Sequence, residues 1–364
     1  MPRSGNAFQP HRLSLVVPYV IAIMVLLVLI VISQRVPRGA VLLETGWEYT
    51  WEDLSAREVA QGAGSWRAID YPSNPPGRDG RSFIWYRRRL PSSPITDPHL
   101  FVFSVDTAAR FYVDGMLLHS WNDWSGATVP EFAGWPPQIV ELPDEYAGRQ
   151  LAVRVGSDYR DIGLWGRLFL GSEQTIYSSI LVRDLPLMAI AIVAGAMLIG
   201  MTALRSPGST PLGVPLALLL ATLIVAVTSA AFSRVIIMDN AYFWFVVETN
   251  AYLVVVAFAA IMVRGVVRNT ARRWTTIYLI LVAVTTIAAN AGAALDVFSL
   301  HNFTSVIDAL TVAGIAMVSA LLLGRRLEES EHRFLVVNLT TMGLLFLGSL
   351  LVSYSVLPWM DNLI

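Results

Sequence analysis

The sequence has no cysteine, and this absence excludes several kinds of chemistry. Without Cys among its 364 residues, the chain can form no disulfide bond, thiolate metal site or cysteine nucleophile. Lysine is also absent, since all 26 basic residues are arginine; we attribute this to codon composition rather than to mechanism. The formal net charge is −1, so there is no electrostatic case for a nucleic-acid partner.

Charge is scarce along the whole chain. Only 15% of the residues are charged and 55% are hydrophobic, whereas a soluble domain carries roughly 25% charged residues. The composition therefore indicates a membrane protein, either alone or joined to a soluble part.

The first long apolar run covers residues 13–33 and follows a basic start that contains Arg3 and Arg12. At about 20 residues it is long enough to cross a bilayer core of roughly 30 Å. A basic front and an apolar middle also fit a signal peptide, but the run lacks a small-residue cleavage signature. We favour an uncleaved anchor over a cleaved signal, with residues 1–12 as a cytoplasmic tail and the following segment exported.

Residues 34–183 have a different composition. They hold eight of the 11 tryptophans and many turn-forming residues, and their apolar runs are short with a period of two. Val113–Met116, VDGM, is a strong hairpin signal between two such runs. Seven or eight short strands are expected, and no convincing amphipathic helix. This pattern predicts an antiparallel β-sandwich or jelly roll.

Six further apolar runs predict a bundle of six transmembrane helices between residues 184 and 357. The expected fold is therefore a mixed membrane protein, with an N-terminal transmembrane helix, an all-β domain and an α-helical bundle. The predicted spans are Asp184–Leu204, Pro211–Phe232, Ala241–Val263, Trp274–Leu295, Phe303–Leu323 and Phe334–Leu357.

The arginines between the runs predict the orientation. If residues 34–183 lie outside, the loops expected inside contain eight arginines, and the outer loops contain only Arg234. This distribution follows the positive-inside rule. It indicates a multi-pass protein of the bacterial cytoplasmic (inner) membrane with its β domain on the outer, periplasmic side. Six crossings would place residues 358–364 outside as well.

The exported segment also resembles a known receptor domain in the order of its motifs. These are GWEYTWEDL, RSFIWYRRRLP, DTAARFYVDGMLL and VRVGSDYRDIGLWGRLFLGSEQTI. The order is similar to that in the galactose-binding-like jelly-roll domain of the bacterial seven-transmembrane receptors with diverse intracellular signalling modules. Asp114 stands where that family usually has Asn, and the likeness continues from about Leu43 through the apolar runs.

The resemblance implies a sensor that binds a ligand outside and signals through its helices to a kinase or cyclase. The family's last helix and its output module are missing from this sequence. We therefore expect the output module in a longer form of the chain or in a cytoplasmic partner protein. A second copy of the chain is left open as a further partner.

Candidate ligand-binding residues lie in two predicted loops of the β region. Aromatic rings beside carboxylates and amides suit sugar-like ligands, which present apolar faces edged with hydroxyls. Packing of the sandwich or docking of the loop on the membrane is the alternative. The candidates are Trp121, Asp123, Trp124, Glu131 and Trp135 in the first loop, and Arg160, Asp161 and Trp165 in the second.

Polar residues inside the predicted spans form a second candidate group. A carboxylate in the bilayer costs at least about 2.5 kcal/mol, so Glu248 and Asp308 need an explanation. With Asn290 they lie roughly 7–11 Å below the outer surface, Asn250 lies slightly deeper, and Arg234 is the nearby outer cation. We expect a polar chamber open to the outside; helix–helix hydrogen bonding is the simpler alternative.

Signals for catalysis are weak. The five histidines are dispersed, and the sequence has no phosphate-binding glycine loop and no nucleophile elbow. We expect no enzyme activity in this chain, no metal and no cofactor. The preferred hypothesis is a membrane receptor for a carbohydrate-like or small polar molecule. A transporter or an accessory subunit of an envelope-assembly complex remains the alternative, although the inner half of the helices lacks the polar groups that a transport path needs.

Overall fold

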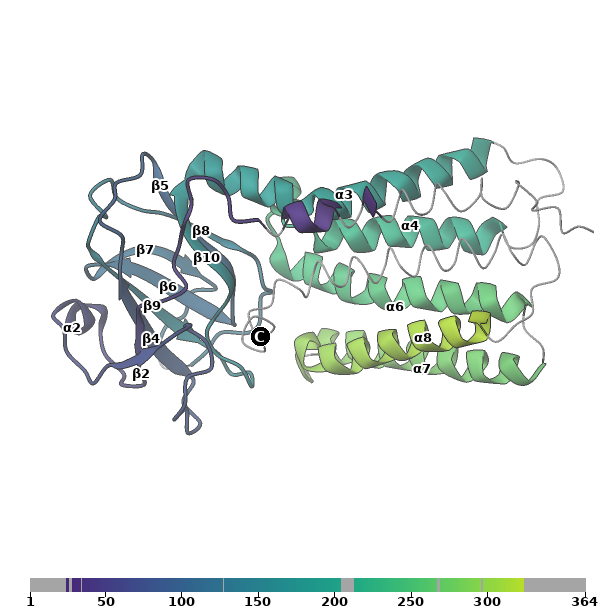
Figure 1. Ribbon diagram of the computed structural model, residues 1–364. Coiled ribbons are helices and arrows are strands. Elements are labelled where there is room, and N and C mark those ends of the chain that lie inside the picture. Colours follow the sequence, from purple (N-terminus) through teal and green to yellow (C-terminus); the bar gives the residue numbers. More distant parts are fainter. Residues whose placement is uncertain are drawn as a thin grey trace, which may run out of the picture.

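The computed structural model describes residues 24–25, 28–33, 35–126, 128–203, 213–266, 269–295 and 297–323. A β domain lies at one end of the molecule, and apolar helices extend side by side from it (Figure 1). The prediction of a chain that combines antiparallel sheets with membrane-length helices is confirmed at this level.

The β domain has two antiparallel sheets. One has the strand order β1-β10-β5-β8 and the other β3-β2-β4-β9-β6-β7. The strands are β1 (Val41–Leu42), β2 (Trp47–Thr50), β3 (Arg67–Ile69), β4 (Phe83–Arg89), β5 (Pro98–Val105), β6 (Ala108–Val113), β7 (Met116–Trp121), β8 (Gln138–Glu141), β9 (Gln150–Gly156) and β10 (Leu164–Ser172).

Strand β5 shows how this domain is attached to the helices. Successive side chains of a strand point to opposite faces of the sheet. Leu100 and Val102 therefore enter the core between the two sheets, whereas Phe101 and Phe103 point the other way and pack with Ile180 and other residues outside that core. Both faces of β5 are thus buried, one of them against the helical part.

The predicted hairpin joins β6 to β7. Asp114 and Gly115 have φ angles of 46° and 82°, the left-handed conformation that a two-residue hairpin turn of the Asp-Gly type requires. The Asp114 carboxylate also accepts a hydrogen bond from the backbone N–H of Gln150 at 3.1 Å, which fixes the turn against β9.

One short helix of the β domain was not predicted. Helix α2 (Ala56–Ala60) is preceded by Ser55, whose side chain accepts a hydrogen bond from the Glu58 N–H while the Glu58 carboxylate reaches back to the Ser55 N–H. This capping box was readable from the Ser-x-x-Glu spacing. A helix of five residues is too short to show an apolar period, so the expectation of no amphipathic helix missed it.

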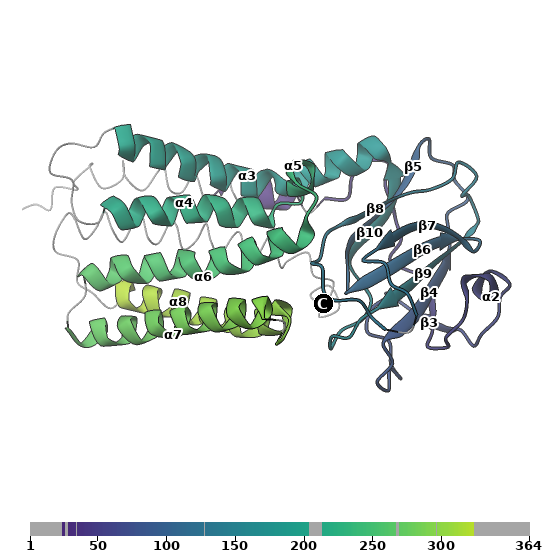
Figure 2. The same cartoon turned by 180° about the vertical axis from the view of Figure 1, so that it is seen from behind.

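Seven helical segments follow the β domain within the part of the chain that the structure describes. They are α3 (Glu173–Ala203), α4 (Gly213–Ala230), α5 (Arg234–Ile237), α6 (Ala241–Val266), α7 (Asn269–Ala294), η1 (Leu300–Phe303) and α8 (Thr304–Leu323). Helix α4 packs between α3 and α6, and α6 packs also on α7 and α8 (Figure 2). Among the described residues, four stretches are long and apolar enough to cross a membrane: Glu173–Met201, Ala241–Arg264, Arg272–Ala294 and Leu300–Leu321.

Five of the six predicted spans coincide with helices α3, α4, α6, α7 and α8, although α4 is shorter than the other four. The sixth, Phe334–Leu357, lies outside the described residues, as do the two tails 1–12 and 358–364 and most of the predicted anchor. Of that anchor, residues 28–33 are helical.

The start of the first bundle helix differs from the prediction. Helix α3 begins at Glu173, directly after β10, and not at Asp184. Ser172 supports the start because its hydroxyl accepts a hydrogen bond from the Thr175 N–H at 3.2 Å. The polar residues of this first segment hid the helix from a hydropathy criterion. Residues 173–183 are therefore helical and not part of the β sandwich.

Candidate functional site

The first group at the junction between the two parts is an ion pair that links α5 to α6. Arg234 donates to the Glu248 carboxylate at 2.9 Å, and Tyr252, one turn further along α6, donates to the other Glu248 oxygen at 3.3 Å. The Arg234 side chain is 7% exposed and that of Glu248 is 24% exposed. The carboxylate that stood out in an apolar segment therefore has a cationic partner.

The two asparagines of the same region form a separate pair between α6 and α7. The Asn250 amide donates to the Asn290 carbonyl oxygen at 3.1 Å, and the Asn290 amide donates to the Asn250 oxygen at 2.7 Å. Each amide group also donates to a backbone carbonyl of its own helix. These reciprocal hydrogen bonds join two helices, as expected for polar side chains that stabilise helix packing in a bundle.

The remaining predicted chamber residue, Asp308, lies half-buried on α8. Four of the five predicted chamber residues thus form two pairs at different helix contacts, Arg234–Glu248 between α5 and α6 and Asn250–Asn290 between α6 and α7.

A loop of the β domain docks on the ends of the helices that face this domain. The ring of Phe132 lies 4.9 Å from that of Phe245 in α6 and 4.5 Å from that of His301 in η1. Trp135 meets Phe245 edge-on at 5.4 Å. Gly134 has a φ of +101°, and a Cβ there would lie 2.8 Å from the Ala241 carbonyl carbon. The loop backbone therefore presses directly on the first residue of α6.

A second loop of the β domain reaches the same helical segment. The Tyr159 ring meets the His301 ring edge-on at 5.0 Å, and the His301 Nδ1 lies 2.7 Å from the Ser299 hydroxyl. His301 is 4% exposed, so the imidazole is enclosed between the β domain and η1.

These contacts border a large cavity between the β domain and the helices. Its empty space is about 1,760 Å³, part of which opens to solvent. Two residues with carboxylates, Glu131 and Asp158, line it from the two β-domain loops. Asn290 and His301 line it from the helical segments. The full lining is Asn122, Glu131, Phe132, Ala133, Asp158, Tyr242, Val246, Asn290, Ala293, Ala294, Phe298, Ser299, Leu300 and His301.

Three predicted ligand residues of the first loop are engaged within the β domain. Trp124 is 6% exposed and stacks on Phe83, and Trp121 packs against the sandwich core. The Asp123 carboxylate accepts hydrogen bonds from Arg110 at 2.6 Å and from the Ser120 hydroxyl at 2.8 Å. These bonds hold the pKa of Asp123 below its usual value, the Ser120 bond contributing most.

Among the eight predicted ligand residues, Glu131 lines the large cavity, and Trp135 helps to dock the loop beside it. In the second loop, Asp161 accepts a hydrogen bond from the Asn74 amide at 2.8 Å. Arg160 is exposed; its backbone carbonyl accepts from Arg78.

Trp165 has a structural partner that the sequence did not reveal. Its indole N–H donates to the buried Asp106 carboxylate at 2.8 Å. Burial raises the pKa of Asp106 to about 7, although the bonds from Trp165 and the Gly163 backbone act in the opposite direction. This carboxyl group therefore titrates near neutral pH within the β domain.

Several cavity residues were not singled out from the sequence, notably Asp158, Tyr242 and His301. Asp158 and His301 lie more than a hundred positions apart in the chain, and no spacing pattern links them. No cluster of three or more metal-ligating side chains occurs in the part of the chain that the structure describes.

No protein-family profile matches the sequence, and no curated protein matches it. Solved structures with partial likeness include a β-glucuronidase from Parabacteroides merdae, with 16% identity and a TM-score of 0.29 over 36% of this chain and 22% of that one. Another is a β-glucuronidase from Bacteroides uniformis, with 17% identity and a TM-score of 0.27 over 36% of this chain and 17% of that one. A glycosyl hydrolase family 2 member from Bacteroides cellulosilyticus has 17% identity and a TM-score of 0.28 over 36% of this chain and 20% of that one. The chain spans less than a third of each, and scores this low carry no argument about activity.

Proposed function

We propose that this chain is the sensing part of a membrane receptor, which binds a small polar molecule outside the cell membrane and transmits the event through its helices. The observation that carries the proposal is the cavity between the β domain and the helices. Its walls come from two β-domain loops and from α6, α7 and η1. A ligand held there contacts both parts at once, so its affinity depends on their relative position.

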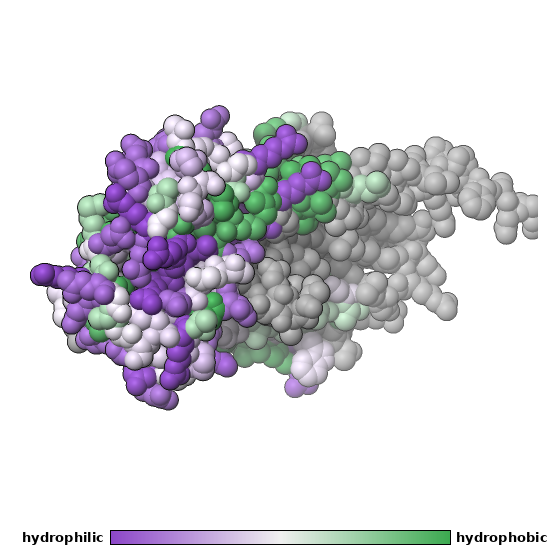
Figure 3. Space-filling model, turned by 60° about the vertical axis from the view of Figure 1, so that its left-hand side comes forward, coloured by the Kyte–Doolittle hydropathy of each residue, from purple (hydrophilic) through white to green (hydrophobic). Residues whose placement is uncertain are grey.

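The surface is compatible with this placement in a membrane. Hydrophilic residues cover most of the visible β domain, and hydrophobic residues gather where it meets the helices (Figure 3). Arg264, Arg272 and Arg273 lie at the other end of the helices, away from the β domain (Figure 1). With positive charge retained inside, this arrangement supports a bacterial inner-membrane protein whose β domain faces outward.

The proposed ligand is a small molecule that carries hydroxyl or amine donors. The Glu131 and Asp158 carboxylates accept hydrogen bonds, and the Phe132, Tyr242 and Phe298 rings offer apolar faces. A carbohydrate-like molecule fits this combination of acceptors and rings. The jelly-roll identity of the β domain and the likeness to seven-transmembrane sensory receptors belong to the same proposal, as does a kinase or cyclase partner for output.

The test is a thermal-shift screen of the full chain in nanodiscs, with sugars, amino sugars and small polyols as probes. A true ligand raises the unfolding temperature of the parent chain. Glu131→Gln and Asp158→Asn reduce that rise, because each removes a charged acceptor from the cavity. Asp144→Asn, at an exposed carboxylate of the β domain, leaves it unchanged. Stabilisation that survives both cavity substitutions would place the ligand elsewhere and refute the proposal.

The transporter alternative predicts a different result. A transported compound would accumulate inside sealed vesicles that contain the protein, whereas a receptor ligand would bind without uptake. Labelled hits from the screen distinguish the two directly.

A further inference from the structure

The large cavity between the β domain and the helices carries charge of one sign. Among the described residues, its lining contains the carboxylates of Glu131 and Asp158 and no arginine. Neither carboxylate forms an ion pair within that part of the chain; Asp158 accepts a hydrogen bond from the Thr107 hydroxyl at 3.3 Å. The helix dipoles do not offset this charge, because the C-terminus of α7 at Ala294 and the N-terminus of α6 at Tyr242 both border the cavity.

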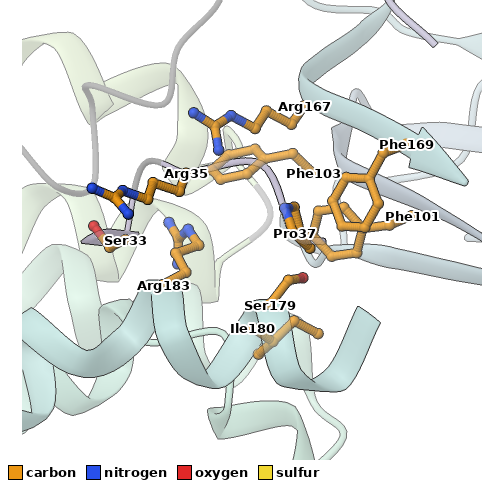
Figure 4. Close-up of a pocket in the computed structure, with 10 residues that line it drawn as sticks. All are labelled: Ser33, Arg35, Pro37, Phe101, Phe103, Arg167, Phe169, Ser179, Ile180 and Arg183. Carbon is orange, nitrogen blue, oxygen red and sulfur yellow. The ribbon is translucent and has the colours of Figure 1, made fainter. Parts of the chain in front are cut away.

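Several arginines of the junction line a different cavity. That cavity has about 400 Å³ of empty space, part of it open to solvent, and shares no lining residue with the large one. Its arginines are Arg35, Arg167 and Arg183 (Figure 4). Arg183 also pairs with Asp184 at 3.1 Å. The described part of the chain therefore places these positive charges away from the two carboxylates of the large cavity.

The amide donors in the lining of the large cavity are already used within the protein. The Asn122 NH₂ group donates to the backbone carbonyls of Thr107 and Glu131, at 2.8 and 2.7 Å. The Asn290 NH₂ group donates to its partner in the α6–α7 pair and to a backbone carbonyl of its own helix, at 2.7 and 2.8 Å. Ionised carboxylates only accept hydrogen bonds. Apart from the hydroxyls of one tyrosine and one serine, the cavity thus offers a ligand acceptors rather than donors.

His301 adds a buried acceptor to this set. The residue is 4% exposed and lines the cavity. Its Nδ1 lies 2.7 Å from the Ser299 hydroxyl, and no described residue bonds to Nε2. A proton on Nδ1 that is directed at Ser299 leaves Nε2 as an acceptor. Because buried polar atoms are normally hydrogen-bonded, we expect a donor within the cavity as its partner.

Tyr242 provides an aromatic face in the same lining. It is the second residue of α6 and is 40% exposed. The Phe132 ring packs against Phe245 and His301, whereas the Tyr242 ring has no aromatic neighbour among the described residues. The face of such a ring attracts a cation within about 6 Å of its centre. Negative charge, free acceptors and an aromatic face all favour the same kind of ligand.

We infer that the large cavity binds a small organic ammonium ion, in preference to an uncharged or anionic molecule of the same shape. The inference rests on the proposed function, because it adds the charge of the ligand to the receptor proposed above. An ammonium group donates hydrogen bonds and accepts none, so it matches the acceptors of the lining. Its charge balances Glu131 and Asp158, which the described arginines do not.

The test is isothermal titration calorimetry of the full chain in nanodiscs with three compounds that share a carbon chain. Glucamine carries an ammonium group, sorbitol has a hydroxyl in its place, and gluconate has a carboxylate. Glucamine is expected to bind about tenfold more tightly than sorbitol, the size of one charge-assisted hydrogen bond, and gluconate more weakly than either. Glu131→Gln and Asp158→Asn should each reduce the preference for glucamine over sorbitol about tenfold.

The matched control is Asp144→Asn, at an exposed carboxylate outside the cavity lining, which should leave the preference unchanged. Equal binding of glucamine and sorbitol, both weakened by Glu131→Gln, would overturn the inference but leave the proposed function standing, since an uncharged ligand would then occupy the cavity. A preference for glucamine that persists in both Glu131→Gln and Asp158→Asn would place the cation elsewhere and overturn the inference. Absence of glucamine binding would overturn it as well, and the wider screen would then decide the proposed function.

Discussion

Replacing Gly134 by alanine tests the docking of the β-domain loop on the membrane helices. The added Cβ would lie 2.8 Å from the carbonyl carbon of Ala241 and 2.9 Å from its oxygen. These atoms belong to the backbone at the start of α6 and cannot rotate away. Either the loop or the helix must move by several tenths of an ångström, and such overpacking costs about 1–3 kcal/mol.

The control for this change is Gly126→Ala in the same loop. Both glycines have positive φ, +101° at Gly134 and +77° at Gly126, so both replacements carry a backbone cost of about 1–2 kcal/mol. A Cβ at Gly126 meets nothing within 4 Å. The difference between the two variants therefore measures the contact with α6.

Hydrogen exchange followed by mass spectrometry is the assay. A loss of about 2 kcal/mol in local stability corresponds to roughly thirtyfold faster exchange. We expect this in Gly134→Ala for peptides that cover residues 128–135 and the first turn of α6, and not in Gly126→Ala. Identical exchange in the two variants would refute the docked arrangement of the loop.

Three further predictions concern other contacts. Glu248→Gln should destabilise the helices by about 3 kcal/mol in SDS unfolding, because it leaves Arg234 buried without its counter-charge. The double variant Glu248→Gln with Arg234→Met should lose less stability than the sum of the losses of the two single variants. Gly314→Ala should lower the unfolding temperature, since its Cβ would fall 2.1 Å from the Tyr278 hydroxyl. Asp106 has a pKa of about 7 in the folded state, against 3.8 when unperturbed, so the folded state holds this proton between about pH 4 and 7 and the unfolded state does not. The contribution of Asp106 to stability therefore falls as the pH rises through that window. In thermal melts, Asp106→Asn should gain stability relative to the parent chain as the pH is raised from 5 to 8.

Each of these predictions has a control and a contradicting result. Strict additivity in the Glu248 and Arg234 cycle would show that the pair is not coupled. A Cβ at Gly200 on α3 would meet nothing within 4 Å, so Gly200→Ala should be neutral or slightly stabilising. An equal drop in unfolding temperature in Gly200→Ala and Gly314→Ala would contradict the close approach at Gly314. Asp79→Asn, at a side chain 78% exposed, is the matched Asp-to-Asn control. A stability difference between Asp106→Asn and the parent chain that does not vary with pH would contradict the raised pKa of Asp106.

Local patterns predicted much of the fold. The strands follow a period of two, and β4, β5, β6, β7, β8 and β9 coincide with the short apolar runs of the sequence. The Asp114–Gly115 turn was readable because few residues tolerate positive φ. The apolar runs also predicted the positions of five helices, because hydropathy depends on local composition and not on distant contacts.

The start of α3 and the candidate cavity could not be predicted in this way. Arg183 and Asp184 are polar, so they resembled the end of a soluble domain, yet both are buried in a continuous helix at the junction. The cavity brings Glu131 and Asp158 beside His301 through tertiary packing alone. The hydrogen-bonded pair of Trp165 on β10 and the buried Asp106, which follows β5, is likewise formed by residues distant in sequence.

Coupling between the two parts of the molecule requires that the β-domain loop controls the arrangement of the helices. The natural sequence has no cysteine, so spin labels at Ile192→Cys on α3 and Ser319→Cys on α8 report one distance without background, across helices on opposite sides of α4 and α6 (Figures 1 and 2). In nanodiscs, we expect Gly134→Ala to shift or broaden this distance distribution and Gly126→Ala to leave it as in the parent labelled chain. An unchanged distribution in Gly134→Ala, with hydrogen exchange confirming that the loop has detached, would contradict coupling between the β domain and the helices.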